Sequence, residues 1–416
     1  MKKSKKILII ILIFIMLLLV FLSARREIVN IDEFDEIISE KIVEKKQGTT
    51  YYVSSQGTSS DGTDITSPMS LSKAKTKKYG SNDRILLKCG DTFYEQVAFN
   101  IEAEDNQYCL ISSYGDGEMP VIDMSKIVSN ANLCETYSNG IYKIDLSNKN
   151  NFDGYVGDNY KSCNIGFFTD SQENIFGNRK NKDEYDFYCD ENSIYIKSVE
   201  NPIEKLGTLK FAIDVGALRA SSNTIYENLK ITNTGVHGIS RNTSNLKNCT
   251  VRNCVIENIG GSVYNKETFT RYGNGIEFWN EAENTLVEKC IIKNTYDAAY
   301  TIQGNTSTIG FKNNICRENI FIGCTYDIEL FSYYKDNNMI TPPMTNSVIS
   351  NNISINQGKG WGYIVRKDKD PSSILVLWGD NSISEHSDIE LKNNVYWNSR
   401  NLFYIHHNNM ISKEKY

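Results

Sequence analysis

Two glutamates occupy matching positions in short apolar stretches of the sequence. Glu277 lies in "GNGIEFWN" and Glu329 in "YDIELFSY", each directly after an isoleucine. If both stretches are strands with that isoleucine inward, both glutamates point outward, because side chains alternate along a strand. With one strand between them, the two backbones are roughly 10 Å apart, and the carboxyls can approach to about 6.5–9.5 Å, as in inverting glycoside hydrolases. The alternative is that they are ordinary glutamates on a solvated sheet.

Two aspartates offer a different chemistry. Asp297 and Asp327 both follow a Thr-Tyr pair, in "TYDAAY" and "TYDIEL", and we expect them to begin strands in neighbouring repeats. Two close carboxylates raise the pKa of one of them or bind a divalent cation such as Ca²⁺. A calcium-assisted lyase would also need a base to remove the proton beside a uronate. The candidate bases are Arg271, Arg241, Tyr272 and His237. Alternatively, each aspartate accepts backbone hydrogen bonds at a turn.

Aromatic and amide side chains accompany these acids in five stretches that align on one apolar position. The stretches are "GVHGISRN", "GNGIEFWN", "YDAAYTIQG", "YDIELFSY" and "GWGYIVRK". The predicted inward column is Ile239, Ile276, Tyr300, Ile328 and Ile364. The predicted outward column is Ser240, Glu277, Thr301, Glu329 and Val365, with Trp279, Gln303 and Phe331 on the same face. A groove of carboxylates and aromatic rings is expected there. Its candidate substrate-binding residues are Trp279, Arg241, Tyr272, Gln303 and Trp361.

An internal repeat provides the elements that would position these residues. Six similar stretches, among them "ENLKITN", "EKCIIKN" and "KNNVYWN", each end on an asparagine. These closing residues are Asn233, Asn258, Asn294, Asn319, Asn356 and Asn398. They are 25, 36, 25, 37 and 42 residues apart, so a unit of 25 residues recurs with insertions. Each unit holds short strands rich in Ile, Val and Tyr, which fits one coil of a parallel β-helix. Asparagines at one turn of successive coils would then stack into a hydrogen-bonded ladder.

Composition excludes several other classes of protein. The chain has 416 residues and a net charge of -6, without a basic stripe, so a general nucleic-acid surface is not expected. Its ten cysteines are scattered and lack zinc-binding spacing. Cys254 and Cys290 share one slot of the repeat, which predicts buried thiols, although a bridged pair stays possible.

The N-terminus predicts export to the far side of a membrane. Residues 1–26 combine four early lysines with a wholly apolar run at 7–22, typical of a signal anchor, or of a signal peptide if cleaved. Residues 27–48 show helical apolar spacing and are expected to form a stalk or linker helix. The remaining chain, 49–410 with a short tail at 411–416, would lie outside the cytoplasm.

Two further stretches resemble a known superfamily. "TYYVSSQGTSSDGTDITSPMSLSKA", followed by "NDRILLKCGDTFYEQV", resembles the opening coil of right-handed parallel β-helix proteins of the pectate-lyase-like superfamily. Residues 164–202 resemble the small β-rich insertion of several carbohydrate-active members, and we place this insertion at about 125–212. The resemblance implies polysaccharides bound along the outside of one sheet, but fold alone does not fix the reaction. "HGIS" at 237–240 is similar to a polygalacturonase motif, yet the accompanying "NTD" and "RIK" motifs are missing.

The sequence therefore predicts an all-β right-handed parallel β-helix with a β-rich insertion, preceded by a transmembrane helix. The expected function is processing of a surface or secreted polysaccharide outside the cytoplasm, by hydrolysis or by elimination. Hydrolysis would use Glu277 with Glu329 or Asp297, and elimination would use Asp297, Asp327 and Arg271 with Ca²⁺ as a possible cofactor. The alternative is a non-catalytic glycan-binding or surface assembly protein.

Overall fold

The structure is a computed structural model. It describes residues 48–158, 160–161, 163–241, 243, 245–304, 310–332, 344–366, 372–379, 388–407 and 410–413. The expected anchor (1–26) and all but the last residue of the expected stalk (27–48) thus lie outside the described residues. Within the described part of the chain, no helix is both long and apolar enough to span a membrane.

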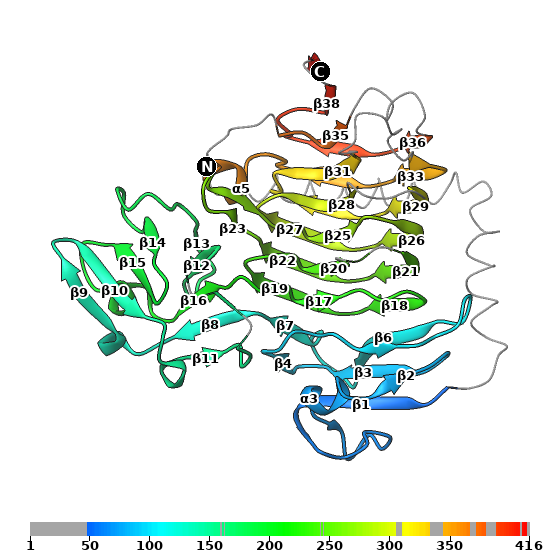
Figure 1. The fold of residues 1–416 in the computed structure, drawn as a ribbon, viewed down its shortest axis with the longest axis horizontal. Helices are drawn as coiled ribbons and strands as arrows, with labels where there is room; N and C mark the ends of the chain where they lie inside the picture. Colours follow the sequence, from blue (N-terminus) through cyan, green and yellow to red (C-terminus); the bar gives the residue numbers. More distant parts are fainter. Residues whose placement is uncertain are drawn as a thin grey trace, which may run out of the picture. The chain divides into compact units, whose positions relative to one another are not determined.

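Three sheets, parallel except for one terminal hairpin, form the walls of a solenoid (Figure 1). Sheet 1 has ten strands, and sheets 2 and 3 have eight each. Successive coils give one strand to each sheet, so that β18, β19 and β20 are followed by β21, β22 and β25. This stacking of each strand on its counterpart confirms the parallel β-helix that the repeat predicts.

Sheet 1 consists of β1 (Thr50–Thr58), β3 (Arg84–Lys88), β6 (Cys109–Tyr114), β18 (Thr224–Glu227), β21 (Leu246–Arg252), β26 (Ala282–Glu288), β29 (Phe311–Arg317), β32 (Met344–Thr345), β33 (Ser347–Ser350) and β36 (Ile389–Lys392). Sheet 2 consists of β4 (Thr92–Phe93), β7 (Val121–Asp123), β19 (Lys230–Thr234), β22 (Val255–Ile259), β27 (Ile291–Thr295), β30 (Ile320–Ile322), β34 (Ile353–Ile355) and β37 (Val395–Trp397). Sheet 3 consists of β17 (Leu218–Arg219), β20 (Ile239–Arg241), β25 (Ile276–Trp279), β28 (Ala298–Gly304), β31 (Tyr326–Ser332), β35 (Leu375–Gly379), β38 (Phe403–His407) and β39 (Met410–Lys413).

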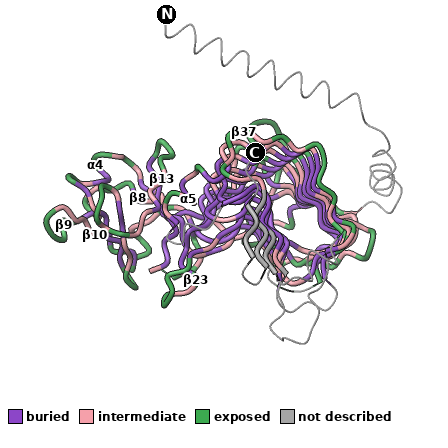
Figure 2. Tube along the Cα trace, turned by 90° about the horizontal axis from the view of Figure 1, so that it is seen from above, coloured by how far each residue is buried: buried purple, intermediate pink, exposed green. Residues whose placement is uncertain are grey.

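The hydrophobic core fills the space between the three sheets (Figure 2). Ile239, Ile276, Tyr300 and Ile328 of sheet 3 are each at most 2% exposed and belong to this core. Their inward orientation agrees with the predicted column. The alternation of apolar and polar residues therefore leaves the intervening side chains of sheet 3 on its outer face.

A ladder of asparagines lines one corner of the solenoid. Asn258 donates to Asn233, Asn294 donates to Asn258, and Asn398 donates to Asn356, each from Nδ2 to Oδ1 of the preceding coil. These five residues have φ between 55° and 58°, a left-handed conformation that asparagine tolerates better than most residues. The chain therefore needs asparagine at this corner for its backbone turn as well as for the ladder.

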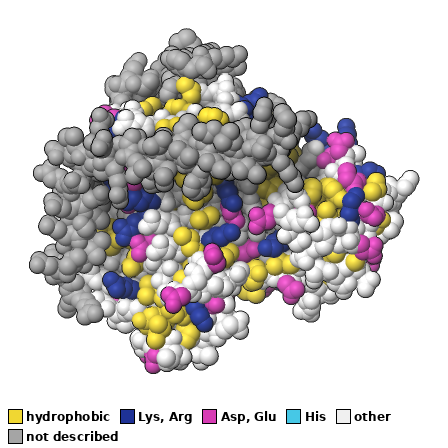
Figure 3. All heavy atoms as spheres, turned by 180° about the vertical axis from the view of Figure 1, so that it is seen from behind, with side chains coloured by type: hydrophobic (Ala, Val, Ile, Leu, Met, Phe, Trp, Pro, Cys, Tyr) yellow, Lys and Arg dark blue, Asp and Glu magenta, His cyan; other side chains and the backbone are white. Residues whose placement is uncertain are grey.

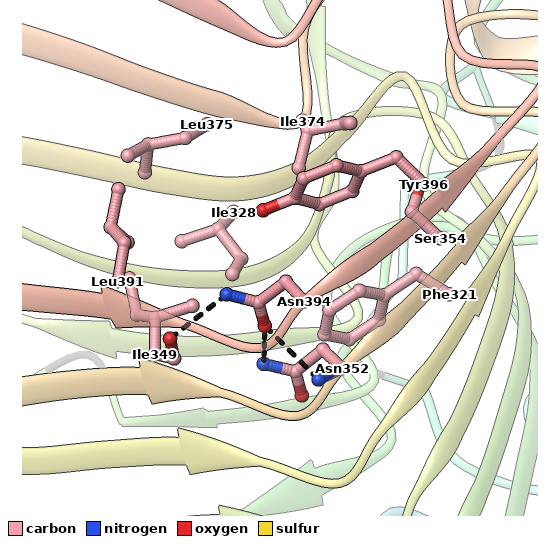
Figure 4. Close-up of a pocket in the computed structure, with 10 residues that line it drawn as sticks. All are labelled: Phe321, Ile328, Ile349, Asn352, Ser354, Ile374, Leu375, Leu391, Asn394 and Tyr396. Carbon is pink, nitrogen blue, oxygen red and sulfur yellow. Dashed lines mark hydrogen bonds between the residues drawn. The ribbon is translucent and has the colours of Figure 1, made fainter. Parts of the chain in front are cut away.

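Asn319 departs from the predicted ladder. Gly323, with a φ of 64°, occupies the corner in its coil, whereas Asn319 faces inward in the slot of Cys254 and Cys290. The amides of Asn319, Asn352 and Asn394 form a second, interior ladder of hydrogen bonds, which Figure 4 shows for Asn352 and Asn394. The inward column thus changes from thiols to amides toward the C-terminal coils. All ten cysteines are free.

Residues 125–212 leave the solenoid between β7 and β18 and form an antiparallel lobe (Figure 1). One sheet of the lobe contains β8 (Ser125–Val128), β11 (Asp153–Gly154), β12 (Phe167–Thr169), β13 (Ile175–Phe176) and β16 (Leu209–Ala212). The other contains β9 (Cys134–Ser138), β10 (Ile141–Asp145), β14 (Phe187–Cys189) and β15 (Ser193–Lys197). The remaining elements are short: β2 (Lys78–Tyr79), β5 (Asn100–Ile101), β23 (Ser262–Asn265), β24 (Thr270–Tyr272), α3 (Leu71–Ala74), α4 (Pro202–Leu206), α5 (Trp361–Ile364), and single 3₁₀ turns at Ala131–Leu133 and Lys149–Asn151.

Candidate functional site

The outer face of sheet 3 carries a continuous column of side chains, one from each coil. Pairing of β17, β20, β25, β28, β31 and β35 aligns Arg219, Ser240, Glu277, Thr301, Glu329 and Val376. The predicted positions of Ser240, Glu277, Thr301 and Glu329 agree with this register. Trp279, Gln303 and Phe331 form a second outer column two residues further along, as expected.

The fifth predicted strand is wrong. "GWGYIVRK" forms α5, so Ile364 and Val365 belong to neither column of sheet 3. A side chain at Gly360 or Gly362 would meet backbone atoms of Gly323 or Tyr296 at 1.9–2.6 Å, so these glycines let the turn pack closely on the neighbouring coil. The strand comes later, from the apolar run "ILVLW", and contributes Leu375 and Val376 in their place.

Two amide side chains donate hydrogen bonds to Glu277, and the imidazole of His237 lies close to it. Oε2 of Glu277 accepts from Nδ2 of Asn274 and from Nε2 of Gln303, both at 2.7 Å, and its Oε1 lies 3.3 Å from Nε2 of His237. The side chain is 6% exposed, and no lysine or arginine among the described residues pairs with it. The two amides and the imidazole take the place of water around a nearly buried carboxylate. Its position is fixed, and no cation neutralises it.

His237 connects Glu277 to the backbone of the next coil. Its Nδ1 accepts the backbone N–H of Asn274 at 3.1 Å, which assigns the proton to Nε2, on the side of Glu277. The imidazole is 5% exposed and meets the ring of Tyr272 edge-on, with ring centres 5.2 Å apart. The geometry therefore places the N–H side of a neutral imidazole 3.3 Å from the carboxylate.

Tyr272 extends this network toward the inserted lobe. Its hydroxyl donates to Oδ1 of Asp214 at 3.2 Å, and Oδ2 of Asp214 accepts from Nδ2 of Asn164 at 3.1 Å. Burial, assisted by the nearby Asp214, raises the pKa of Tyr272 well above its usual value, so the phenol stays protonated. Tyr272 lies beside His237 as a hydrogen-bond donor and aromatic neighbour, rather than as a base.

Thr301 separates Glu277 from Glu329 in the outer column. The side chain of Thr301 is fully buried, and its Oγ1 has no hydrogen-bond partner within the described residues. Glu329 is 9% exposed and stands two strand spacings, or roughly 10 Å of backbone, from Glu277. The column therefore places one hydroxyl between two carboxyl groups.

Asp297 and Asp327 do not pair, contrary to the expectation from their shared "TYD" motif. In the sheet, Ala298 pairs with Tyr326, so the two motifs are two residues out of register. Asp297 forms an ion pair with Arg366 at 3.1 Å. Asp327 is fully buried, accepts a hydrogen bond from Ser354, and has an Oδ1 without a partner among the described residues. Burial raises the pKa of Asp327 to about 8.

This separation removes the calcium site that the two aspartates would have formed. Ser354, which donates a hydrogen bond to Asp327, lines a small interior cavity together with apolar side chains and the amides of Asn352 and Asn394 (Figure 4). Within the described residues, no group of three or more His, Cys, Asp or Glu side chains is arranged to hold a metal ion.

Arg271 and Trp361 lie at the junction between solenoid and lobe, not on the outer column. The guanidinium of Arg271 donates to the carbonyls of Gly261, Gly177 and Gly166, and burial lowers its pKa to about 9. The indole of Trp361 packs against Phe167 at 4.9 Å and donates to the carbonyl of Asn294. Both side chains hold the lobe against the solenoid.

Arg241 also differs from its predicted role. It aligns with Phe278, Ile302 and Leu330, which are inward-facing core residues, and its Nη1 donates to the carbonyl of Ala220. The cation on the outer column is instead Arg219, which is exposed and precedes Ser240. The two-residue strand β17 is too short to be recognised as a repeat from the sequence.

Sequence reasoning also missed Asn274 and Asp214. Asn274 lies in the "GNG" turn before β25, and its amide side chain donates to Glu277 and accepts the N–H of Ala298. Asp214 lies where the chain returns from the lobe, and nothing in the local sequence indicates that it reaches Tyr272. Basic and acidic side chains elsewhere are interspersed on the face in Figure 3, without a large patch of one sign.

No family model and no curated protein matches the chain. Among solved structures, it resembles XylC in complex with xylose, with a TM-score of 0.50 and 10% identity over 84% of this chain, and it spans 66% of that chain. A lacto-N-biosidase of the GH136 type from Eubacterium ramulus has a TM-score of 0.37 and 13% identity, over 86% of this chain and 68% of that one. Pectate lyase Pel9A has a TM-score of 0.36 and 12% identity, over 91% and 82%. At such identities the likeness concerns the fold alone. Its stacked parallel sheets and this likeness to XylC show that the chain has a parallel β-helix fold.

Proposed function

We propose that this protein is a carbohydrate-active enzyme that hydrolyses a surface or secreted glycan bound along the outer face of sheet 3. The observation that carries the proposal is Glu277, a nearly buried carboxylate on an outer sheet face. Two amides donate to it, His237 lies 3.3 Å away, and no lysine or arginine of the described residues pairs with it. For a carboxylate that only stabilised the sheet, burial would cost less free energy with a lysine or arginine beside it. Buried carboxylates without a cationic partner are more typical of functional sites than of structural ones.

The hydrolytic mechanism assigns one carboxyl group to each side of the scissile bond. Glu277 accepts two hydrogen bonds on Oε2, which fix the carboxylate in position to act as the base that takes a proton from water. The water oxygen attacks the anomeric carbon, the glycosidic C–O bond breaks, and Glu329 donates a proton to the leaving oxygen. Thr301, between the two, offers an unpartnered hydroxyl to orient that water or a sugar hydroxyl. The backbone separation of roughly 10 Å favours inversion at the anomeric carbon.

Elimination receives less support from the geometry. It requires Asp297, Asp327 and Arg271 to meet at one site, whereas they face an arginine, the solenoid interior and the lobe junction, respectively. The outer column with Glu277 and Glu329 is the better candidate. Names of the similar structures, which include a xylose complex, a lacto-N-biosidase and a pectate lyase, add that carbohydrate ligands occur on this fold.

The proposed location is the outside of the cytoplasmic membrane. The basic and apolar residues of segment 1–26 support a retained anchor, or secretion if that segment is cleaved. A surface or secreted glycan would then be within reach of the β-helix. Fractionation of cells, with protease added to the intact cells, tests this location, since an internal domain would survive the protease.

The function is tested by incubating the full chain with panels of neutral, N-acetylated and acidic polysaccharides. New reducing ends without the absorbance of unsaturated uronates are expected. Both signals together would indicate a lyase and contradict the hydrolytic assignment. Binding without any bond cleavage, unchanged by Glu277→Gln, would support the rival function of a non-catalytic glycan-binding protein.

A further inference from the structure

The inserted lobe carries a cluster of three tyrosines on the sheet that contains β9, β10, β14 and β15: Tyr137 is exposed, Tyr188 is half-buried and Tyr195 is buried. The side chains of Tyr188, Tyr195, Lys143 and Glu135 form one row across this sheet, because their strands pair in that order. The residues on either side of Tyr195, Ile194 and Ile196, belong to the hydrophobic core. The row therefore lies on the face of the sheet opposite to the core.

The three rings pack on one another and form a small aromatic platform. Tyr188 stacks on Tyr195 with ring centres 4.4 Å apart and planes within 5°, and Tyr137 meets Tyr195 edge-on at 4.9 Å. Tyr137 is 57% exposed, and Tyr188 lies on the edge strand β14, so the ring face turned away from Tyr195 points beyond the sheet edge. Exposed rings of this kind cost solubility and are usually retained for binding.

A polar hollow adjoins the platform on the same face. It has a volume of about 430 Å³, within the usual range for small-molecule sites. It is lined by Lys143, Asp145, Ser147, Asp190, Glu191, Asn192 and Ser193. Asp190 connects the two features, because its Oδ2 accepts the hydroxyl of Tyr195 at 2.7 Å while Oδ1 accepts the backbone N–H groups of Asn192 and Ser193. The turn that forms the rim of the hollow is thereby fixed in place.

We infer that this face of the lobe is a second glycan-binding site, separate from the outer column of sheet 3. A pyranose ring has one face of C–H groups that packs on a flat aromatic ring, and an edge of hydroxyls that hydrogen-bond to carboxylates, amides and lysine. The platform and hollow offer these two surfaces side by side. The choice of a glycan as occupant rests partly on the proposed function.

The charge of the hollow selects the class of sugar. Three of its lining residues are acidic and one is basic, and Glu135 adds a further carboxylate to the row. Uronates and sulfated sugars would be repelled, whereas neutral and N-acetylated glycans would not. A lobe that holds one segment of a polymer raises the effective concentration of the rest near the solenoid.

Affinity electrophoresis of the full chain tests the inference directly. The gels contain xyloglucan, galactomannan or glycol chitin as neutral probes, with polygalacturonate as the acidic probe. Retardation by at least one neutral probe is expected, weakened about tenfold by Tyr188→Ala and less by Tyr137→Ala. Tyr188→Phe should retain binding because the ring remains. Val199→Ala, at a 78% exposed apolar residue of the same lobe, is the matched control and should bind like wild type.

Glu277→Gln separates the two sites. Retardation that survives Glu277→Gln but falls with the tyrosine variants supports the lobe site, even if no polysaccharide is cleaved and the proposed hydrolase function fails. Loss of binding in Glu277→Gln with no change in Tyr188→Ala and Tyr137→Ala would overturn the lobe site and leave the hydrolase proposal intact. Absence of retardation by every neutral probe, or stronger retardation by polygalacturonate, would also overturn the inference.

Discussion

Glu257 and Glu277 are two nearly buried carboxylates of the solenoid that differ in their partners, which are charged for Glu257 and neutral for Glu277. Glu257 lies in sheet 2 and is 3% exposed, whereas Glu277 lies in sheet 3 and is 6% exposed. Lysines from the coils on both sides pair with Glu257: Lys230 at 2.8 Å and Lys293 at 2.6 Å. Burial alone would raise the pKa of Glu257, but these two lysines bring it below its usual value. Glu277 has only neutral donors.

The difference separates a structural carboxylate from a candidate catalytic one. In sheet 2 the sequence supplies Lys230, Glu257 and Lys293 in successive coils, so the two lysines neutralise the carboxylate. In sheet 3 the same coils supply Ser240, Glu277 and Thr301, so the negative charge is left for a ligand or a proton. Burial therefore does not identify a site by itself, but the identity of the partners does.

Among the substitutions that test this comparison, replacement of Glu277 should change the rate of hydrolysis most. Glu277→Gln keeps the shape of the side chain but cannot accept a proton from water, and we expect hydrolysis to fall at least about 1,000-fold. Release of reducing ends under saturating substrate measures the loss. Thermal unfolding serves as the control, and a midpoint far below that of wild type would mean that the loss reflects misfolding.

His237 is expected to have an intermediate effect as a positioning residue. His237→Ala removes the imidazole beside Oε1 of Glu277 but leaves Asn274 and Gln303, so kcat should fall about tenfold to a hundredfold while KM changes little. Steady-state kinetics on a soluble oligosaccharide gives both constants. A change confined to KM would instead assign His237 to substrate binding.

Asp327 extends the comparison to a carboxyl group with neither cations nor several donors. Its pKa rises from 3.8 in the unfolded chain to about 8 in the folded one, so between these values the folded state binds a proton that the unfolded state does not. The free energy of unfolding should therefore fall as pH rises from about 4 to about 8. Asp327→Asn should flatten this slope, as urea titrations at several pH values would reveal. An unchanged slope would contradict an interior protonated Asp327.

Glu257 should give the smallest effect. Glu257→Gln leaves Lys230 and Lys293 without their shared partner, and both lysines are about one-third exposed, so water compensates much of the loss. We expect the free energy of unfolding to fall by about 1 kcal/mol and hydrolysis to remain at the wild-type level. Urea unfolding and the reducing-end assay measure the two quantities. A large loss of hydrolysis would remove the distinction between the two glutamates.

The repeat made the fold predictable, whereas the partners of the site residues were not. Alternation of apolar residues gave the correct inward and outward columns in four coils, because one residue of slip would bury every polar side chain. Asp297 and Asp327 show the limit: identical tripeptides entered the sheet two residues out of register, which depends on turn geometry beyond the motif. Arg271 was expected beside the acids, but its guanidinium donates to three backbone carbonyls. Two of these carbonyls belong to the inserted lobe, about a hundred residues earlier in the sequence. Such contacts between distant segments leave no recognisable pattern in the local sequence.

The most direct test of the central claim is the ratio of hydrolytic rates of Glu257→Gln and Glu277→Gln on the same glycan. Both substitutions convert one nearly buried glutamate to glutamine, so general effects of lost charge are matched. The different partners of the two glutamates predict a ratio of about 1,000 or more, with both variants folded. A ratio near one would contradict the assignment of Glu277 as the catalytic carboxylate.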